Sequence, residues 1–208
     1  AMLGSADYFD ALHDGQVNAV FAKRQPGSAL KPFTYGIAFA QGYTPATIIP
    51  DVETVIPTAQ GNFTPKNYDN NFHGPVRARI ALACSYNVSA VRVLQTLGVA
   101  ALLSKLHECE MQSLDQTADY YGHGLTLGNG EVTLFELTRA YSALANRGRW
   151  NALTFDIQPG PIHAPKEIFS PQVAFLITDI LSDASARVPS FGYDSPIGLP
   201  FPCAAKTG

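Results

Sequence analysis

Charged side chains are scarce in this sequence. Asp, Glu, Lys and Arg make up only 15% of the 208 residues, whereas 46% are hydrophobic, and the formal net charge is −3. A chain of this length can bury a sizeable core. Because the sequence has neither a basic stripe nor a base-stacking motif, nucleic acid is not an expected partner. No apolar run approaches the ~20 residues that a helix needs to cross a bilayer.

Cysteine is scarce too. Cys84, Cys109 and Cys203 are odd in number and far apart, so they form no CxxC motif and predict no disulfide framework. The run His107–Glu110 contains potential metal ligands. No second pair of ligands stands at helical spacing, however, and a solvated helix end is the simpler interpretation. We therefore expect no metal and no cofactor.

The hydrophobic pattern predicts a chain whose middle is mostly helical and whose two ends resemble sheet. Residues 44–73 are rich in Pro, Asn, Asp and Thr, which favours an extended surface connection, and the glycines of 122–130 indicate a tight loop. Thr133–Glu136 has the sequence of a capping box, and Ser170-Pro171 that of a helix start. We predict helices over 28–41, 75–84, 88–97, 99–109, 133–148 and 170–181, and strands or extended chain over 2–9, 16–24 and 201–207.

A serine and a lysine, Ser28 and Lys31, stand three residues apart at the start of the first predicted helix. Helical geometry places both side chains on one face, so the amine can take the hydroxyl proton and the serine can attack a carbonyl. A lysine acts as a base only when burial or a nearby cation lowers its pKa. Burial of the helix start and Lys206 would supply these conditions. In isolation the pattern is common, and a surface lysine near a helix cap explains it equally well.

A second short motif, Ser85-Tyr86-Asn87, lies between two predicted helices. The Ser85 hydroxyl there can pass a proton between Lys31 and a leaving amine. The Asn87 amide has both donors and acceptors, so it can hold Lys31 and a peptide group of the substrate together. Taken alone, Asn87 would be interpreted as an ordinary N-cap.

A third motif, Lys206-Thr207-Gly208, would line one wall of a cleft from a strand. Thr207 can hydrogen-bond a substrate carboxylate, and Lys206 gives that carboxylate a positive field. Gly208 would let a substrate backbone lie close to the strand. A solvated strand end is the alternative for this motif alone. The three motifs in this order are typical of penicillin-binding proteins and class A β-lactamases.

Longer stretches around these motifs resemble class A penicillin-binding proteins. Residues 24–33 (RQPGSALKPF) are similar to the family's RxPGSxxKPF stretch, and residues 80–87 (IALACSYN) to its ALxxSxN stretch. Residues 62–68 (NFTPKNY) resemble its YxPxNY segment, and residues 127–134 (LGNGEVTL) its LGxGEVT segment. Residues 199–208 look most like the penicillin-binding protein 1C branch. Together the matches run from the second residue to the last.

The resemblance implies a β-lactamase/transpeptidase-like α+β fold, with an antiparallel sheet, helices on both of its faces and a helical lobe. It implies a penicillin-binding peptidoglycan D,D-transpeptidase that acts on D-Ala-D-Ala stem peptides and is acylated by β-lactams. Ser28 would be the acylated nucleophile, Lys31 its base and Ser85 a proton relay. The substrate would be bound by Asn87, Lys206, Thr207 and Gly208.

The resemblance also implies that residues 1–208 are part of a transpeptidase domain, incomplete at both ends. In the family a membrane anchor and a glycosyltransferase domain precede this region, at the periplasmic face of the bacterial inner membrane. One oxyanion-hole N–H would come from Ser28 and the other from a residue just past Gly208. The isolated, soluble fragment is therefore expected to be slow or inactive, since one lost donor costs ~10²–10³ in rate in a protease. An unpaired sheet edge at 201–208 predicts dimerisation or aggregation.

Two alternatives are left open by the sequence. A serine β-lactamase would share the three motifs but would also need a glutamate in an E-x-x-x-N setting. Glu131 has Phe135 at the place of that Asn, and Glu136 fits a helix cap. A non-catalytic β-lactam sensor or structural domain is the second alternative. Degeneration is disfavoured because the motif side chains are intact, whereas a sensor would be acylated too and would differ only in its attached domains.

Overall fold

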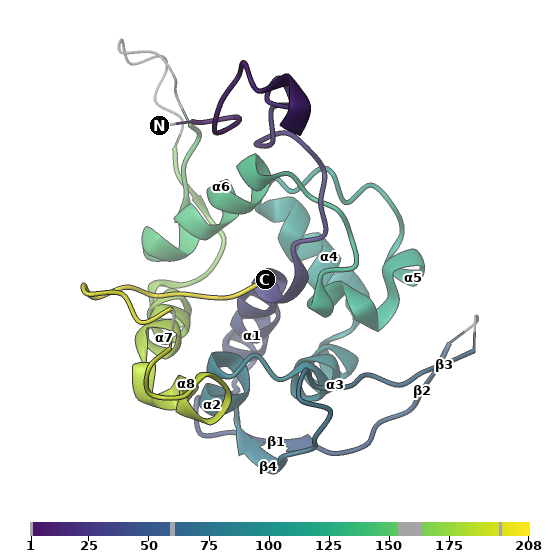
Figure 1. Cartoon of the computed structure of the whole chain (residues 1–208). Coiled ribbons are helices and arrows are strands. Elements are labelled where there is room, and N and C mark those ends of the chain that lie inside the picture. The colour runs from purple at the N-terminus through teal and green to yellow at the C-terminus, as the bar shows by residue number, and fades with distance from the viewer. Residues whose placement is uncertain (1, 59–60, 154–163, 196) are drawn as a thin grey trace.

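The computed structural model describes residues 2–58, 61–153, 164–195 and 197–208. Helices dominate this part of the chain (Figure 1). Three short 3₁₀-helices also occur: η1 (Ala11–His13), η2 (Gly27–Leu30) and η3 (Gly122–Leu127). The α-helices are α1 (Lys31–Ala40), α2 (Ala78–Ala83), α3 (Asn87–Leu97), α4 (Val99–Glu108), α5 (Ala118–Tyr121), α6 (Leu134–Ala145), α7 (Pro171–Ser182) and α8 (Ala184–Phe191).

The strands of the described residues pair two by two, and each pair is antiparallel. The α+β class is thus confirmed, with short ladders in place of one broad sheet. The longest ladder has four residues in each strand and lies beside α2 and α3 (Figure 1). The pairs are β1 (Ile48–Asp51) with β4 (Gly74–Arg77), β2 (Ile56–Thr58) with β3 (Gly61–Phe63), and β5 (Arg149–Trp150) with β6 (Lys166–Glu167).

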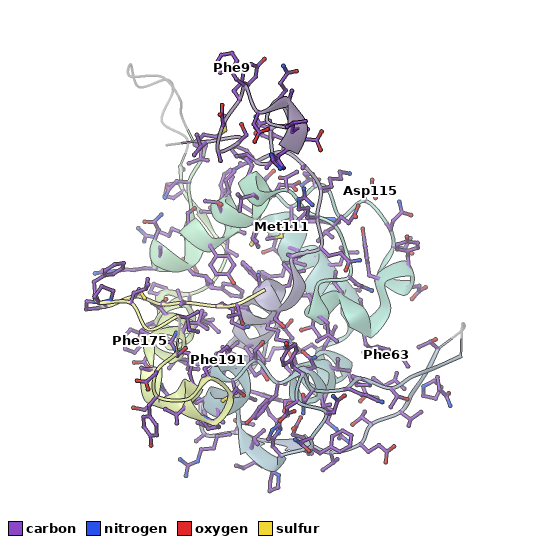
Figure 2. All side chains as sticks on the ribbon, in the orientation of Figure 1. Phe9, Phe63, Met111, Asp115, Phe175 and Phe191 are labelled. Carbon is purple, nitrogen blue, oxygen red and sulfur yellow. The ribbon has the colours of Figure 1, made fainter. Side chains whose placement is uncertain are left out.

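Helix α1 lies in the middle of the molecule, with α2, α3, α4 and α7 packed around it (Figure 1). Every residue from Lys31 to Phe39 is buried, as expected of a helix that is surrounded on all sides. Leu30 and Phe33 are among the fully buried side chains of this core. Met111, labelled in Figure 2, is another. Burying one large apolar side chain contributes about 1.5–3 kcal/mol to the stability of the fold. The packing of α1 against its neighbours therefore stabilises the part of the molecule that carries Lys31.

Each predicted helix has a counterpart, although residues 75–77 of the helix predicted over 75–84 belong to β4 and α2 covers only Ala78–Ala83. Two predicted helix starts are confirmed in detail. The Thr133 hydroxyl accepts the Glu136 N–H at 3.1 Å, and the Glu136 carboxylate accepts the Thr133 N–H at 2.9 Å. Ser170 caps α7 by accepting the Val173 N–H at 3.3 Å. No single helix of the described chain is long and apolar enough to cross a membrane; α3 and α4 meet that test only as a pair bent by 93°.

For 2–9 and 16–24, which were predicted as strands or extended chain, the strand alternative is wrong. Turns and η1 occupy this region, and only Arg24 forms an isolated β-bridge, with Val132. The apolar residues there do not mark a buried face: Phe9 projects from the molecule, 86% exposed, and Leu12 is 91% exposed (Figure 2). Their spacing therefore carried no information about a sheet.

Other boundaries also differ from the sequence prediction. The strand predicted over 201–207 is wrong, because this extended segment has no partner strand among the described residues; its one backbone bond to a helix joins the Ala205 N–H to the Leu181 carbonyl. Dimerisation was predicted through a sheet edge at 201–208. Because no strand forms there among the described residues, the structure does not support this dimer, and it stays a prediction. Residues 44–73 hold β1, β2 and β3, the glycine-rich 122–130 holds η3, and α8, with Pro189 inside it, was not predicted.

Candidate active site

Three segments that are far apart in the sequence meet at one cleft of about 520 Å³. The chain end lies beside the start of α1 (Figure 1), where Gly208 contacts Pro26 and Ala29. Lys31 is buried and Lys206 is partly buried. The other predicted site residues all line the cleft: Ser28, Ser85, Asn87, Thr207 and Gly208.

Ser28 lies in η2, which runs directly into α1. In a 3₁₀-helix the side chains of residues i and i+3 eclipse one another, and the Lys31 N–H donates to the Ser28 carbonyl. Ser28 and Lys31 therefore share a face as predicted, although through a 3₁₀ turn rather than an α turn. Among the described residues no hydrogen-bond partner engages the Ser28 hydroxyl, and Ser28 lines the cleft.

The turn that carries Ser28 is held from two sides. Gly27 and Gly128 have φ angles of 58° and 76°, which only glycine adopts without strain. Their backbones pack so closely that a Cβ on Gly128 would collide with Gly27. Tyr141 donates its hydroxyl to the Ala29 carbonyl at 2.8 Å. The backbone on both sides of Ser28 is thus held by contacts outside its own helix.

The amine of Lys31 has three acceptors around it. Nζ lies 2.5 Å from the Ser85 carbonyl oxygen, 2.6 Å from Asn87 Oδ1 and 3.2 Å from Ser85 Oγ. An ammonium has three N–H donors, so the protonated form is fully satisfied. A neutral amine can donate to the two nearer oxygens and keep its lone pair for a hydroxyl. The site therefore accommodates both protonation states of Lys31.

Ser85 is positioned by the end of α2. Its φ angle is 62°, and the Ser85 and Tyr86 N–H groups donate to the carbonyls of Leu82 and Ala81. This left-handed cap usually carries glycine at the position of Ser85. A residue with a Cβ there costs about 1–2 kcal/mol, and such strain concentrates at functional positions. Here the serine supplies the hydroxyl that faces both lysines.

Lys206 approaches that hydroxyl from the opposite wall. Its Nζ lies 2.7 Å from Ser85 Oγ and 2.9 Å from the Thr207 carbonyl oxygen. Ser85 Oγ is therefore within hydrogen-bond distance of two amines, at 3.2 Å from Lys31 and at 2.7 Å from Lys206. Two positive charges so close to one oxygen repel each other, which favours the loss of a proton from one of them.

Burial lowers the pKa of both lysines, and the charge of Lys206 adds to the shift of Lys31. Burial is the main cause that lowers the pKa of Lys31 well below 10.5; the charge of Lys206 lowers it further, and the carboxylate of Asp51 acts in the opposite direction. Burial lowers the pKa of Lys206 to about 7. A lysine that loses its proton near neutral pH can act as a general base.

Thr207 and Gly208 line the cleft together with Asn87 and Ser28. A Cβ on Gly208 would strike the Pro26 carbonyl and would lie 3.1 Å from Ala29 Cβ. Glycine is therefore needed so that the chain end can lie against the turn of Ser28. This packing reason differs from the one predicted, which was the approach of a substrate backbone.

The potential metal ligands of 107–110 have other partners. His107 Nε2 donates to the Leu114 carbonyl at 2.7 Å, and Glu108 pairs with Lys105 at 2.5 Å. Burial raises the pKa of the Cys109 thiol to about 12. Within the described ranges, no three His, Cys, Asp or Glu side chains converge in a way that could hold a metal ion.

Comparison of the chain with known proteins shows the family to which it belongs. Residues 2–208 match the family described as "Penicillin binding protein transpeptidase domain". The chain belongs to this family. Penicillin-binding protein 1C of Escherichia coli (strain K12) is 33% identical over 207 residues, which cover 99% of this chain and 26% of that protein. Penicillin-binding protein 1A of Neisseria meningitidis serogroup A is 34% identical over 152 residues, covering 71% of this chain and 18% of that protein.

Solved structures show that the fold is the transpeptidase fold, as the resemblance predicted. Penicillin-binding protein 1A from Haemophilus influenzae superposes with a TM-score of 0.71 at 24% identity, over 86% of this chain and 32% of that one. Penicillin-binding protein A from M. tuberculosis gives a TM-score of 0.68 at 18% identity, over 87% of this chain and 48% of that one. The chain spans about a quarter or less of the length of the two curated relatives named above.

Sequence reasoning missed the polar residues behind the motifs of this transpeptidase domain. Asn67 Oδ1 accepts the N–H groups of Asn87 and Val88 at 2.8 and 3.2 Å, and Asp51 is fully buried. Neither residue was given a role, because the segment 44–73 has the composition of a surface connection. The one available signal was that Asn67 falls within the stretch 62–68, which resembles the family.

Proposed function

We propose that this chain is a serine D,D-transpeptidase domain of peptidoglycan synthesis, which acylates Ser28 with a stem peptide ending in D-Ala-D-Ala. The observation that carries this proposal is the Ser85 hydroxyl, which lies 3.2 Å from the Lys31 amine and 2.7 Å from the Lys206 amine beside an unengaged Ser28. Family membership gives the class of chemistry, and this geometry supports the role that we propose for each side chain.

In the first step, the neutral Lys31 amine takes the Ser28 proton as Oγ attacks the carbonyl of the penultimate D-Ala. The ammonium that forms has three acceptors: the Ser85 carbonyl oxygen, Ser85 Oγ and Asn87 Oδ1. As Lys31 then returns its proton to Ser85 Oγ, the Ser85 hydroxyl gives its own proton to the leaving nitrogen. D-Ala departs as a neutral amine, and Ser28 keeps the acyl group as an ester.

In the second step, an amine of a neighbouring stem peptide attacks the ester. The same groups run in reverse, so that Lys31 and Ser85 remove the proton of the attacking amine and Ser28 recovers its own. The Asn87 amide, whose oxygen already accepts from Lys31, lies in the cleft where it can orient the peptide chain.

The second lysine suits recognition of the terminal carboxylate. Lys206 has a pKa lowered to about 7 by burial, and an incoming carboxylate favours its charged form. Thr207 lines the cleft next to it and offers a hydroxyl donor. A charge-assisted pair of this kind contributes more than a neutral hydrogen bond.

We also propose the setting of the whole protein. Residues 1–208 would be part of a transpeptidase domain within a longer, bifunctional protein that also carries a peptidoglycan glycosyltransferase and is anchored at the periplasmic face of the inner membrane. The support is the partial coverage of the relatives, 26% of penicillin-binding protein 1C and 18% of penicillin-binding protein 1A. Stem peptides and β-lactams would be its ligands.

Mass spectrometry of the whole protein that carries this chain, after incubation with benzylpenicillin, tests the proposal. We expect the mass of one drug molecule to be added, and the Ser28→Ala variant to show no addition. Ser182→Ala, which removes a serine on α7, is the matched control and should react like the wild type. An adduct that persists in Ser28→Ala, or no adduct on folded wild type, would overturn the assignment.

Protein that has not been treated with penicillin separates the two alternatives. A β-lactamase would hydrolyse a chromogenic cephalosporin steadily, and a sensor would transfer no acyl group from a D-Ala-D-Ala peptide to a D-amino acid acceptor. The structure disfavours the β-lactamase, because the Glu136 carboxylate already accepts the N–H groups of Thr133 and Ser113 at 2.9 and 2.8 Å. We expect slow hydrolysis and measurable transfer to the acceptor.

A further inference from the structure

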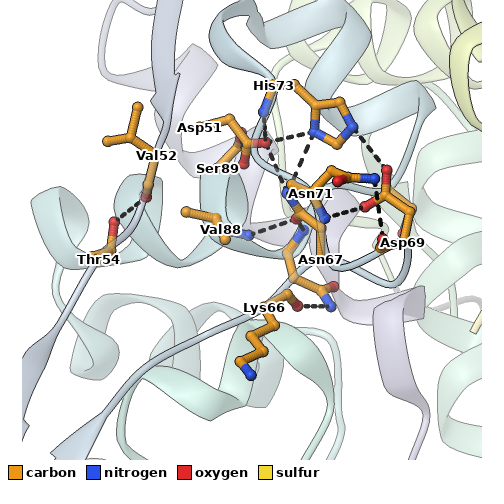
Figure 3. A network of polar contacts seen from close by, with 12 residues as sticks. Asp51, Val52, Thr54, Lys66, Asn67, Asp69, Asn71, His73, Val88 and Ser89 are labelled. Atoms are coloured by element: carbon orange, nitrogen blue, oxygen red, sulfur yellow. Dashed lines mark hydrogen bonds and ion pairs between the residues drawn. The ribbon is translucent and has the colours of Figure 1, made fainter.

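Behind the cleft, a second cluster of polar side chains surrounds a buried carboxylate (Figure 3). Asp51 ends β1 and is fully buried. Its Oδ2 accepts from Asn67 Nδ2 at 2.7 Å, from the His73 backbone N–H at 2.9 Å and from His73 Nδ1 at 2.6 Å. Its Oδ1 accepts from the Ser89 hydroxyl at 3.2 Å. A buried carboxylate is tolerated only when it is satisfied in this way.

Asn67 joins this carboxylate to the start of α3. Its Nδ2 donates to Asp51 and, at 2.9 Å, to the Asn71 carbonyl. Its Oδ1 accepts the N–H groups of Asn87 and Val88, which are two of the unpaired donors at a helix start. Tyr86, at the N-cap position of α3, provides no side-chain cap. Asn67 therefore caps α3 from a segment 20 residues away in the sequence.

The same segment fixes the side chain of Asn87. Asn87 Nδ2 donates to the Lys66 carbonyl at 2.8 Å (Figure 3). With its amino group held there, the amide turns its oxygen toward Lys31, whose Nζ lies 2.6 Å from Asn87 Oδ1. The backbone and the amide of Asn87 are thus both positioned by residues 66 and 67, and the Lys31 amine is positioned by Asn87.

We propose, on the basis of the function proposed above, that Asn67 and Asp51 are positioning residues for acylation, which act on the Lys31 amine through Asn87. Asn67 sets the place of Asn87, and Asp51 sets the orientation of Asn67. The Asp51 carboxylate also places one buried negative charge in the part of the structure that holds Lys31 and Lys206. Asp51 is buried and does not line the cleft, whereas Asn67 lines it with an amide that is already engaged by Asp51, Asn71 and the start of α3.

The side chains of Asn67 and Asn87 lie between the Asp51 carboxylate and the Lys31 amine. This separation explains why the negative charge does not keep Lys31 protonated. A carboxylate in direct contact with Lys31 would favour the ammonium and remove the base. With Asn67 and Asn87 in between, the contact chain holds the amine in place while the charge acts from a distance. Burial and Lys206 lower the pKa of Lys31, and Asp51 raises it in part.

Several other titratable groups face this pair and have to be considered in any pH profile. Tyr35 on α1 is buried, and burial followed by the Asp51 charge raises the pKa of its hydroxyl. The groups that face Lys31 or Asp51 are Lys206 from the chain end, Tyr35 from α1, His73 from the segment before β4, and Tyr86, whose ring stacks on His73 at 3.8 Å. Asp69 contacts the other ring nitrogen of His73 at 3.1 Å.

The pH dependence of acylation tests the role of Asp51. Asp51→Asn keeps the size of the side chain but removes its charge, so we expect the acidic limb of the acylation rate to move to lower pH. Asp115→Asn, which removes an exposed carboxylate, should leave the limb in place. Rates are measured with a fluorescent penicillin on the whole protein and divided by the folded fraction from thermal unfolding.

Two variants test Asn67. Asn67→Ala loses both the helix cap and the link to Asp51, and we expect acylation to fall about 10–100-fold, as misplacement of a catalytic group by roughly 1 Å does. The double exchange Asp51→Asn with Asn67→Asp moves the charge one residue closer to Lys31. It does not restore the wild-type hydrogen bonds, because the new carboxylate would face the Asn71 carbonyl oxygen, to which Asn67 Nδ2 donates. In the folded fraction we expect the acidic limb to lie at higher pH than in the wild type.

The outcomes separate this inference from the proposed function. If wild type forms a Ser28 adduct, but Asp51→Asn and the double exchange keep the wild-type pH profile, the positioning role is wrong and the proposed function stands. Wild-type acylation rates in Asn67→Ala would also overturn it. If wild type forms no adduct, the proposed function fails, and ¹⁵N NMR titration of the Lys31 amine in Asp51→Asn still tests the inference: an unchanged midpoint contradicts it.

Discussion

The two lysines of the site reach one hydroxyl from opposite walls, and they are held in different ways. Lys31 belongs to α1, in the centre of the core, and three oxygen acceptors surround its amine. Lys206 belongs to an extended segment, which crosses from α8 to the start of α1 (Figure 1) and makes one backbone hydrogen bond to α7, from Ala205 to Leu181. The wall that carries Lys31 is part of the core, whereas the segment that carries Lys206 packs against the surface of that core.

The residues proposed for proton transfer and those proposed for substrate recognition therefore lie in different parts of the structure. The helical wall carries Ser28, Lys31 and Ser85, whose geometry has to be accurate for proton transfer. The segment 201–208 carries the groups that would meet the substrate carboxylate, and it depends on the close contact of Gly208 with Pro26. Changes in the first wall should therefore remove the reaction, and changes in the second should alter its pH dependence or its affinity.

The largest effect is expected from the helical wall. Lys31→Met removes the proton acceptor, and we expect the rate of Ser28 acylation to fall ~10³-fold, within the range for loss of a general base. The measurement is the rate of adduct formation with a fluorescent penicillin, on protein shown to be folded by circular dichroism. A rate within tenfold of the wild type would mean that another group is the base.

The next largest effect is expected at the contact between Gly208 and Pro26, where the segment 201–208 packs against the turn of Ser28. Gly208→Ala places a Cβ against the Pro26 carbonyl, so the segment has to move away from Ser28. We expect acylation to fall about 10–100-fold, by the same argument from misplaced groups. Ala204→Ser, at an exposed position of the same segment, is the control. Equal rates for both variants would show that the contact does not matter.

A smaller effect, on pH dependence, is expected from the second lysine. The charge of Lys206 helps to lower the pKa of Lys31, so Lys206→Met should raise that pKa. The acidic limb of the acylation rate should then move to higher pH, opposite to the shift expected for Asp51→Asn. A limb that stays in place, or moves to lower pH, would contradict the coupling of the two amines.

The smallest effect concerns stability. The pKa of Lys206 is about 7 in the folded chain, against 10.5 as its ordinary value. Between these values the unfolded state binds more protons, so this group makes stability rise as pH increases from about 7 to 10.5. Lys206→Met should show a smaller rise of Tm across this window. The account fails here if both proteins give parallel curves of Tm against pH.

The sequence predicted the parts of this molecule that depend on local rules. Thr133 and Ser170 mark helix starts because capping is a matter of a few neighbouring residues. The motif serines and lysines were identified because their spacing and order are distinctive. The strand over 201–207 failed because an extended pattern does not say whether a partner strand exists.

What escaped prediction depends on contacts between distant residues. The position of Ser85 at a left-handed helix end follows from the closure of α2, which no motif states. Asn67 and Asp51 are 16 residues apart in a segment of polar composition, yet they meet at 2.7 Å in a buried network. The packing of Gly128 on Gly27 is likewise invisible before the chain is folded.

The central claim is that two amines with lowered pKa values flank the Ser85 hydroxyl, and ¹⁵N NMR titration of the lysine side chains tests it most directly. Lys31→Met and Lys206→Met assign the two resonances. We predict that Lys206 titrates near a pKa of about 7 and that the pKa of Lys31 lies well below 10.5. If both amines titrate at the ordinary lysine value of about 10.4, the site does not hold a base at neutral pH and the account is wrong.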